Sequence, residues 1–505
     1  MTEEAVTRAG GRRMVSGVFW NALGRGLPLV LALVLTPVLI HQMGIDRWGL
    51  FTLALALVGV FSILDLGVGQ ALTRALSERI GLGQREGEAE LVAGAIAVLA
   101  TLSGTACLVV WFGVPTLVGR ILNVPDALQA EAIAAIRVLV VAAPLVVVNA
   151  ALWGVLAAHQ KFRAANLVTI PVGIFYYLGP VLALLVWDSL VGVMLTLVAC
   201  RLANTLSYAW LIRPLVPGLW RRPRLAPVLP LMRIGGWMTV SGILTQLLLY
   251  TDRFLIGALL TLSAVAFYAT PLDLVMRFWI LPVAVAQALL PALASSFRTL
   301  PAETVTLLRR GALLIGAIVL PACLLLVAFA HPILQLWLGT NFADGGAGVM
   351  RILGVGILFS CVAFAPGSLI DAIGRPDVTA KFALAQVVVF LPLSALALIR
   401  FGIEGAAAVW SLRAAVDCAG RLWLAGRFYP AAVTAVRQVV PSLALGGLGL
   451  AAAAAMPTTT LALLFGSLAL LGFVVGALGA LSMDERASFF RAIRDPRALL
   501  RRRAA

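Results

Sequence analysis

The residues in this sequence most able to do chemistry are charged side chains inside long apolar blocks. A charge at the centre of a membrane helix costs about 2.5–3.5 kcal/mol, so each one needs a compensating role. Six of them are arginines and five are aspartates, and none is a lysine. A guanidinium binds phosphate oxygens through paired, planar hydrogen bonds, so these arginines predict an anion site. The charged positions are Arg25, Asp65, Arg201, Asp252, Arg253, Asp273, Arg277, Asp371, Arg413, Asp417 and Arg421.

Asp252 and Arg253 are adjacent in one block. Neighbours on a helix point about 100° apart, so these two charges cannot simply neutralise each other. At least one of them must face a partner helix or a cavity. Arg253 is the strongest single candidate for anion binding because it lies deep in its block. The alternative is an interhelical ion pair.

Asp273 and Arg277 are four residues apart, which places them on one face of a helix. Two arrangements are open. Either the two side chains form an ion pair within the helix, or Arg277 faces a cavity and Asp273 orients it.

Arg413, Asp417 and Arg421 form a stripe along one helix face, with a spacing of four residues. One aspartate between two arginines leaves one positive charge unmatched locally. Arg421 lies near the end of its block, where a long side chain can also extend to the membrane surface.

Three further charges have two interpretations each. Arg25 lies about 12 Å into the first block and is flanked by two glycines. It either binds an anion or extends back to the membrane surface. Asp65 and Asp371 lie nearer the ends of their blocks, as coupling carboxylates or as helix-packing partners.

Several other chemistries are excluded. The five cysteines form no CxxC pair and are predicted to be packing residues. The three histidines stand singly and no HExxH occurs, so no metal site is expected. Neither Lys161 nor Lys381 stands in the GxxxxGK[ST] pattern that holds nucleotide phosphates, which excludes ATP hydrolysis. No internal polar stretch is long enough for a soluble catalytic domain, so an enzyme is not expected.

The elements that must position these residues are membrane-spanning helices. The 505 residues are 62% hydrophobic and only 12% charged, whereas soluble domains carry about 25% charged residues. Apolar blocks of about 20 residues follow one another, and each can cross a hydrocarbon core of about 30 Å as a helix. We predict an all-α, polytopic membrane protein with about fourteen spans. They lie near 17–40, 48–73, 91–113, 133–158, 165–187, 190–212, 234–259, 265–293, 311–331, 349–373, 380–400, 404–426, 438–456 and 461–482.

The net charge of +16 predicts the orientation of these spans. Most basic residues fall in the N-terminal segment, in every second loop and in the tail. The opposite loops hold only Arg47, Arg120, Arg137, Arg351 and Arg400. By the positive-inside rule the arginine-rich side is cytoplasmic, so both termini are predicted to be cytoplasmic. Basic residues confined to the flanks of spans do not favour nucleic-acid binding.

The sequence also repeats itself at an offset of 213 to 217 residues. Trp20 aligns with Trp237, and IRVL at 136–139 aligns with MRIL at 350–353. Six spans per repeat is an even number, so both copies share one orientation, with an axis along the membrane normal. Two parallel six-helix lobes with the substrate between them are typical of a transporter that works by alternating access. The predicted parts are an N-terminal segment 1–16, a first lobe 17–212, a linker 213–233, a second lobe 234–426, two extra helices 438–482 and a basic tail 483–505.

Particular phrases of the sequence resemble a known family. Its first spans read FWNALGRGLPLVLALVLTPVLIHQMG and WGLFTLALALVGVFSILDLGVGQALTRALSE. Its seventh and eighth read YTDRFLIGALLTLSAVAFYATPLDLVMRFWILPVAVAQALLPALASSF, and Leu122-Asn123-Val124-Pro125 precedes the fourth. These phrases are similar to bacterial polysaccharide transporters, the lipid-linked oligosaccharide flippases of the multidrug/oligosaccharidyl-lipid/polysaccharide exporter (MOP) superfamily.

This resemblance implies a MATE-like fold of 12 to 14 helices in two lobes, which agrees with the repeat. It implies export of an undecaprenyl-diphosphate-linked oligosaccharide across the inner membrane for O-antigen or exopolysaccharide biosynthesis. The family's mechanism places arginines of spans one, seven and eight against the diphosphate, and here these spans hold Arg25, Arg253 and Arg277. The supporting or ion-coupling residues are then Asp65, Asp252, Asp273, Arg413 and Asp417.

Two other functions remain open. A cation-coupled drug antiporter of the sister family needs carboxylates in its cavity, but span 17–40 has none and the interior leans positive. A membrane-embedded glycosyltransferase or polymerase needs acidic residues on a large periplasmic loop. The longest such segment, 114–132, offers only Asp126 and Glu131.

The expected interactions follow from the resemblance. No cofactor and no metal are expected, apart from H⁺ or Na⁺ as a coupling ion. The expected partners are the lipid-linked oligosaccharide, membrane lipids, and the polysaccharide polymerase and chain-length machinery.

Overall fold

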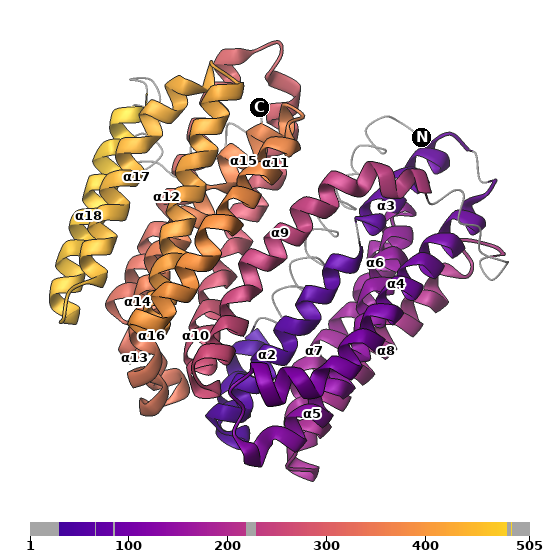
Figure 1. The fold of residues 1–505 in the computed structure, drawn as a ribbon. Coiled ribbons are helices and arrows are strands. Elements are labelled where there is room, and N and C mark those ends of the chain that lie inside the picture. The colour runs from indigo at the N-terminus through magenta and orange to yellow at the C-terminus, as the bar shows by residue number, and fades with distance from the viewer. Residues whose placement is uncertain (1–29, 66, 84–85, 219–228, 482–485, 487–505) are drawn as a thin grey trace. The chain divides into compact units, whose positions relative to one another are not determined.

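The computed structural model describes residues 30–65, 67–83, 86–218, 229–481 and Arg486. The regular elements of this part of the chain are all helices, and it contains no strand. Eleven of its helical segments are long and apolar enough to cross a membrane. The chain is therefore an all-α, multi-pass membrane protein, as predicted. Its contacts divide it into two compact units, unit 1 (Met1–Ala269) and unit 2 (Thr270–Ala505), and Figure 1 shows their helices.

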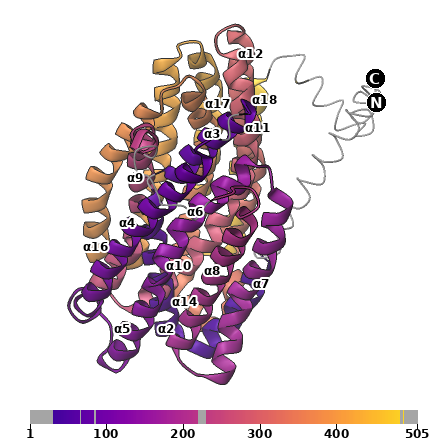
Figure 2. The same ribbon diagram turned by 90° about the vertical axis from the view of Figure 1, so that its right-hand side faces the viewer.

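Unit 1 begins, within the described residues, with a short apolar helix, Val30–Met43. The elements that follow are α2 (Ile45–Phe61), the 3₁₀ turn η1 (Ser62–Asp65), α3 (Val68–Gly81), α4 (Glu88–Thr116), the π turn η2 (Leu117–Ile121), α5 (Asp126–Val140), α6 (Ala142–Ala158), α7 (Phe162–Val186), α8 (Leu190–Ile212) and α9 (Leu229–Leu259). Helix α10 (Leu262–Met276) begins in unit 1 and ends in unit 2. Helices α7 and α8 lie side by side, as Figure 2 shows.

The core of unit 1 forms where α3, α4, α6 and α8 bury their apolar faces, with Leu72, Leu99 and Tyr208 among the buried residues. Lipid tails are as apolar as leucine, so close packing of small residues holds such helices together. Gly154 of α6 provides one such contact: a Cβ there would lie 2.7 Å from the carbonyl oxygen of Gly69 on α3.

Unit 2 contains the end of α10 and then η3 (Arg277–Trp279), α11 (Ile280–Ser296), α12 (Pro301–Ala328), α13 (Ala330–Leu338), α14 (Thr340–Val362), α15 (Phe364–Ala372), α16 (Pro376–Phe428), α17 (Ala432–Ala454) and α18 (Thr459–Ala480). Helix α16 is interrupted at Gly402, where φ is 60° and ψ is −152°. Only glycine adopts this conformation readily. The segments 376–401 and 403–428 are therefore two helices, and the second folds back on the first. Helices α17 and α18 pack against α12 in this unit (Figure 1).

The sequence repeat appears in the structure as a repeat of helix breaks. The turn η1 interrupts the path from α2 to α3, and η3 interrupts the path from α10 to α11. Their first residues, Ser62 and Arg277, are 215 positions apart. In the same way Val141 separates α5 from α6, and Ala363 separates α14 from α15.

The count of fourteen spans remains a prediction. Each of the eleven spanning segments coincides with a predicted block, and α16 covers the two predicted spans 380–400 and 404–426. The predicted span 234–259 lies in α9, which is not among the eleven. Of the predicted span 17–40, only the part from Val30 onward is described. The lobe and linker boundaries also remain predictions.

Candidate functional site

Arg253 lies on α9 with only 5% of its surface exposed. Its guanidinium carbon is 5.6 Å from the ring centre of Tyr250, one helical turn earlier, which is a cation–π contact. The neighbouring Asp252 accepts a hydrogen bond of 3.0 Å from the hydroxyl of Tyr268 on α10, and Tyr268 is fully buried. The two adjacent charges therefore contact different groups: Arg253 meets the ring face of Tyr250, and Asp252 binds the hydroxyl of Tyr268.

Helix α9 runs antiparallel beside α2 (Figure 1). A Cβ on Gly59 of α2 would lie 2.6 Å from the ring of Tyr250. The amide of Gln246 donates a hydrogen bond of 2.7 Å to the hydroxyl of Ser62, in the turn after α2. Because Tyr250 stacks on the arginine and also meets Gly59, Arg253 belongs to the part of α9 that α2 covers.

Asp65 is the last residue of η1, and its carboxylate accepts a hydrogen bond of 2.9 Å from the backbone N–H of Gly69. Gly69 lies in the first turn of α3, where backbone N–H groups have no partner within the helix. Asp65 therefore caps α3. Whatever else this carboxylate does, it has a structural task.

Arg277 begins η3, and its side chain is exposed. It lies roughly 22 Å along the helix from the first residue of α10. In the described part of the chain no carboxylate forms an ion pair with it. The turn is anchored by Trp279, whose indole N–H donates to Ser360 at 3.0 Å and whose ring meets Phe364 edge-on at 5.8 Å. Arg277 is thus presented on a fixed turn, while Asp273 is half-buried on α10.

Asp417 accepts a hydrogen bond at each carboxylate oxygen. The buried amide of Gln386 donates at 2.8 Å, and the guanidinium of Arg421 donates at 2.9 Å. Gln386 lies in the first half of α16 and Asp417 in the second, so the carboxylate joins the two halves. The third member of the stripe, Arg413, lies over the ring of Trp410 at 5.8 Å.

The predicted diphosphate-binding arginines fall in different parts of the chain. Arg253 belongs to unit 1 and Arg277 to unit 2. Arg25 lies outside the described residues. Their convergence on one cavity therefore remains a prediction.

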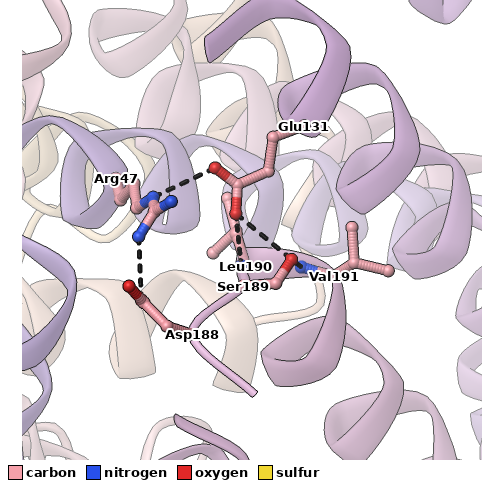
Figure 3. A network of polar contacts seen from close by, with 6 residues as sticks. All are labelled: Arg47, Glu131, Asp188, Ser189, Leu190 and Val191. Carbon is pink, nitrogen blue, oxygen red and sulfur yellow. Dashed lines mark hydrogen bonds and ion pairs between the residues drawn. The ribbon is translucent and has the colours of Figure 1, made fainter.

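Arg47 has a role beyond its predicted topology signal. Figure 3 shows its guanidinium between two carboxylates, 3.0 Å from Glu131 of α5 and 2.9 Å from Asp188 before α8. Glu131 also accepts hydrogen bonds from the hydroxyl of Ser189 at 3.2 Å and the backbone N–H of Leu190 at 2.7 Å. This network joins the start of α2 to α5 and to the start of α8.

Neutral polar residues inside the spans also make contacts, which the pattern of charges does not predict. Gln246 and Gln386 both bind partners on another helix or turn. A signal was available, because a buried amide without a partner is costly and an amide in an apolar block therefore implies a contact.

Metal ligation has no support in the described residues. No group of three or more histidine, cysteine or acidic side chains in them is placed to hold a metal ion. The five cysteines are free thiols.

Comparison of the sequence with known proteins gives one family match and two relatives. A family described as polysaccharide biosynthesis protein matches residues 14–297. A protein of Shigella flexneri named for O-antigen transport is 25% identical over 419 residues, covering 81% of this chain and 97% of the relative. Membrane protein EpsK of Bacillus subtilis, named as uncharacterised, is 24% identical over 356 residues, covering 67% of this chain and 68% of EpsK.

Comparison of the fold gives transporters among its neighbours. A multidrug-resistance MATE family transporter of the MOP superfamily, in an inward-facing conformation, matches with a TM-score of 0.70 at 14% identity. The match covers 81% of this chain and 98% of that one. The lipid II flippase MurJ, in an inward closed conformation, matches with a TM-score of 0.68 at 11% identity. This match covers 95% of this chain and all of MurJ. Both comparisons support a MATE-like fold.

Proposed function

The chain belongs to the polysaccharide biosynthesis protein family, and we propose that it is a flippase for an undecaprenyl-diphosphate-linked oligosaccharide. The similarity to a protein named for O-antigen transport supports this class of substrate. The likeness to the folds of a MATE transporter and a lipid flippase is consistent with transport. The protein acts in the bacterial inner membrane and carries the glycan from the cytoplasmic to the periplasmic leaflet. No covalent bond forms or breaks, so the protein is a transporter and not an enzyme.

The observation that carries the proposal is the position of Arg277 in a membrane-spanning segment. Its guanidinium is exposed, deep in a membrane-spanning run, and forms no ion pair in the described part of the chain. A permanent charge at such depth marks a substrate pathway more often than a packing contact. An arginine with exposed donors suits the paired oxygens of a diphosphate, whereas a cationic drug would be repelled.

In the proposed mechanism each part of the substrate has its own surroundings. The arginines Arg25, Arg253 and Arg277 compensate the diphosphate for the water it loses on entering the membrane. The uncharged glycan follows the diphosphate, and the polyprenyl chain stays in lipid. Alternating access of the two lobes then exposes the headgroup on the other side. An H⁺ or Na⁺ gradient drives the cycle, with Asp65, Asp252 and Asp273 as the candidate coupling carboxylates.

Deletion of the gene tests the proposed function. In the deletion strain, lipid-linked oligosaccharide is expected to accumulate on the cytoplasmic face of the inner membrane. A glycosidase that is added to the periplasm reaches only the periplasmic face, so oligosaccharide on the cytoplasmic face is protected from cleavage. Unchanged glycolipid transport together with lost drug efflux would favour the antiporter instead.

Substitution of Arg277 tests the site. Arg277→Ala is expected to lower the rate of glycan export about 10- to 100-fold, because the diphosphate loses a charged, bidentate partner. Arg277→Lys keeps the charge without the planar fork and is expected to lie in between. The rate is measured as newly displayed surface glycan at matched expression. Arg400→Ala, which removes an exposed arginine at the end of the first half of α16, is the control. Wild-type export by Arg277→Ala would remove this residue from the substrate path.

A further inference from the structure

The segment Leu122-Asn123-Val124-Pro125 holds the end of α9 through one residue. The backbone N–H of Asn123 donates to the carbonyl oxygen of Gly257 at 2.8 Å. Its side-chain amide donates to the carbonyl oxygens of Ala258 at 3.1 Å and Leu260 at 2.9 Å. One residue thus binds three carbonyl groups of the turn that leads from α9 to α10.

The carbonyl groups that Asn123 binds can bind water instead, so this contact can both form and break. The last carbonyls of a helix have no partner within it, so they bind another group or water. Asn123 supplies that group, yet its side chain is exposed. If the turn moves away, water can bind the same carbonyls at little cost. Hydrogen bonds of this kind are reversible.

Small residues shape the surface on which the turn rests. A Cβ on Gly257 would lie 2.9 Å from Leu53 and 3.2 Å from Leu122. A Cβ on Gly49 of α2 would overlap the carbonyl oxygen of Leu262, the first residue of α10. The turn therefore fits closely onto α2 and the 122–125 segment.

The two sides of this contact are fixed by different forces. On the α2 side, Arg47 is bound to Glu131 and Asp188, so charged groups tie α2, α5 and the start of α8 together (Figure 3). The α9–α10 turn is held at Asn123 by neutral hydrogen bonds to its backbone. Neutral hydrogen bonds are roughly half as strong as charge-assisted ones, so separation is expected at Asn123 and not at Arg47.

We propose that Asn123 is a gate residue, which holds the α9–α10 turn closed against α2 and releases it when the transport cycle opens this end of unit 1. We call the contact of Leu122 and Asn123 with residues 257–262 the Asn123 clasp. The inference rests on the proposed transport function. The structure described here has the clasp closed.

Amide hydrogen exchange tests the clasp without any substrate. In the full chain reconstituted in lipid nanodiscs, Asn123→Ala is expected to raise the exchange of residues 256–264 about tenfold, because the closed state loses two side-chain hydrogen bonds. Asn123→Asp is expected to raise it further, since a carboxylate repels the carbonyl oxygens. The matched control is Gln129→Ala, because the side-chain amide of Gln129 donates its hydrogen bonds to Val124 and Asp126 nearby and not to the α9–α10 turn. Exchange in Asn123→Ala equal to that of the unsubstituted chain would refute the clasp.

A reversible cross-link tests whether the clasp must open. In the double variant Asn123→Cys with Ala258→Cys, oxidation is expected to stop glycan export and dithiothreitol to restore it. Each single variant is expected to export at one rate of its own, which is the same with and without the oxidant. The gate would be refuted if the double variant exports equally fast in its oxidised and reduced forms, in a strain in which deletion of the gene blocks export. If deletion itself leaves export unchanged, the proposed function fails, and the exchange measurement still decides whether the clasp exists.

Discussion

Asp417 shows how the protein tolerates a charge in a membrane-spanning helix. Both oxygens of its carboxylate are occupied, one by Gln386 and one by Arg421. A carboxylate bound in this way favours a role in joining the two halves of α16 over a role in ion coupling. Arg277 differs, because its side chain is exposed and no carboxylate in the described residues pairs with it. At the scale of single residues, surroundings separate structural charges from candidates for substrate binding.

We expect Asp417→Asn to destabilise the protein by about 2 kcal/mol, since it removes the charge that balances Arg421 and weakens a hydrogen bond to a charged group. Thermal unfolding of the purified protein in detergent measures this loss. The double variant Asp417→Asn with Arg421→Gln makes the cluster neutral and is expected to lose less than the two single variants together. Lost export with unchanged stability in Asp417→Asn would instead indicate a coupling role.

Helix α2 packs closely against α9. A glycine at this contact is therefore expected to tolerate a side chain less well than a glycine with open space around it. Tyr250 occupies the space where a side chain on Gly59 would lie, while Gly104 on α4 has open space around it. The same substitution at these two positions therefore has different consequences.

Gly59→Ala is expected to cost about 1–3 kcal/mol, because its methyl group forces Tyr250 and α9 to shift. Gly104→Ala is expected to change the stability by no more than about 0.5 kcal/mol. The comparison uses thermal unfolding under identical conditions. Equal stability of the two variants would mean that α2 and α9 are not in the contact described here.

The positions of the helices were predictable, but their internal breaks were not. Long apolar blocks with charged ends mark a span whatever its neighbours are, and this is why each spanning segment matches a predicted block. The 3₁₀ turns at Ser62 and Arg277 depend on contacts such as that of Trp279 with Ser360, 81 residues away in the chain. No local pattern encodes such a partner.

The candidate site was predictable only in part. Charged positions could be found from the sequence, because a charge in an apolar block is rare. Their partners could not: Asp252 binds Tyr268, and Asp417 binds Gln386, which lies 31 residues before it. Asn123 lies in a segment noted for its resemblance to the family, but its side-chain contacts with Ala258 and Leu260 join residues 135 and 137 positions apart.

At the scale of the whole molecule, the distribution of arginine predicts one orientation in the membrane. Thr299, between α11 and α12, is then cytoplasmic, and Pro457, between α17 and α18, is periplasmic; both are exposed. We expect a membrane-impermeant maleimide to label Pro457→Cys in intact cells and Thr299→Cys only after lysis. The unsubstituted chain, with its five native thiols, gives the background. Labelling of Thr299→Cys in intact cells would reverse the proposed orientation.

The pairing of α2 with α9 also has a consequence for the biogenesis of the protein. Helix α2 leaves the ribosome long before α9, so its glycine-containing face has no partner while α3 to α8 are being inserted. A chain cut after Ile212 lacks α9, so that face would stay in contact with lipid, with Gly49, Leu53 and Gly59 uncovered. A chain cut after Ala269 would include α9 and the whole Asn123 clasp. Expression of the N-terminal part alone is therefore expected to give a stable product only from the longer fragment.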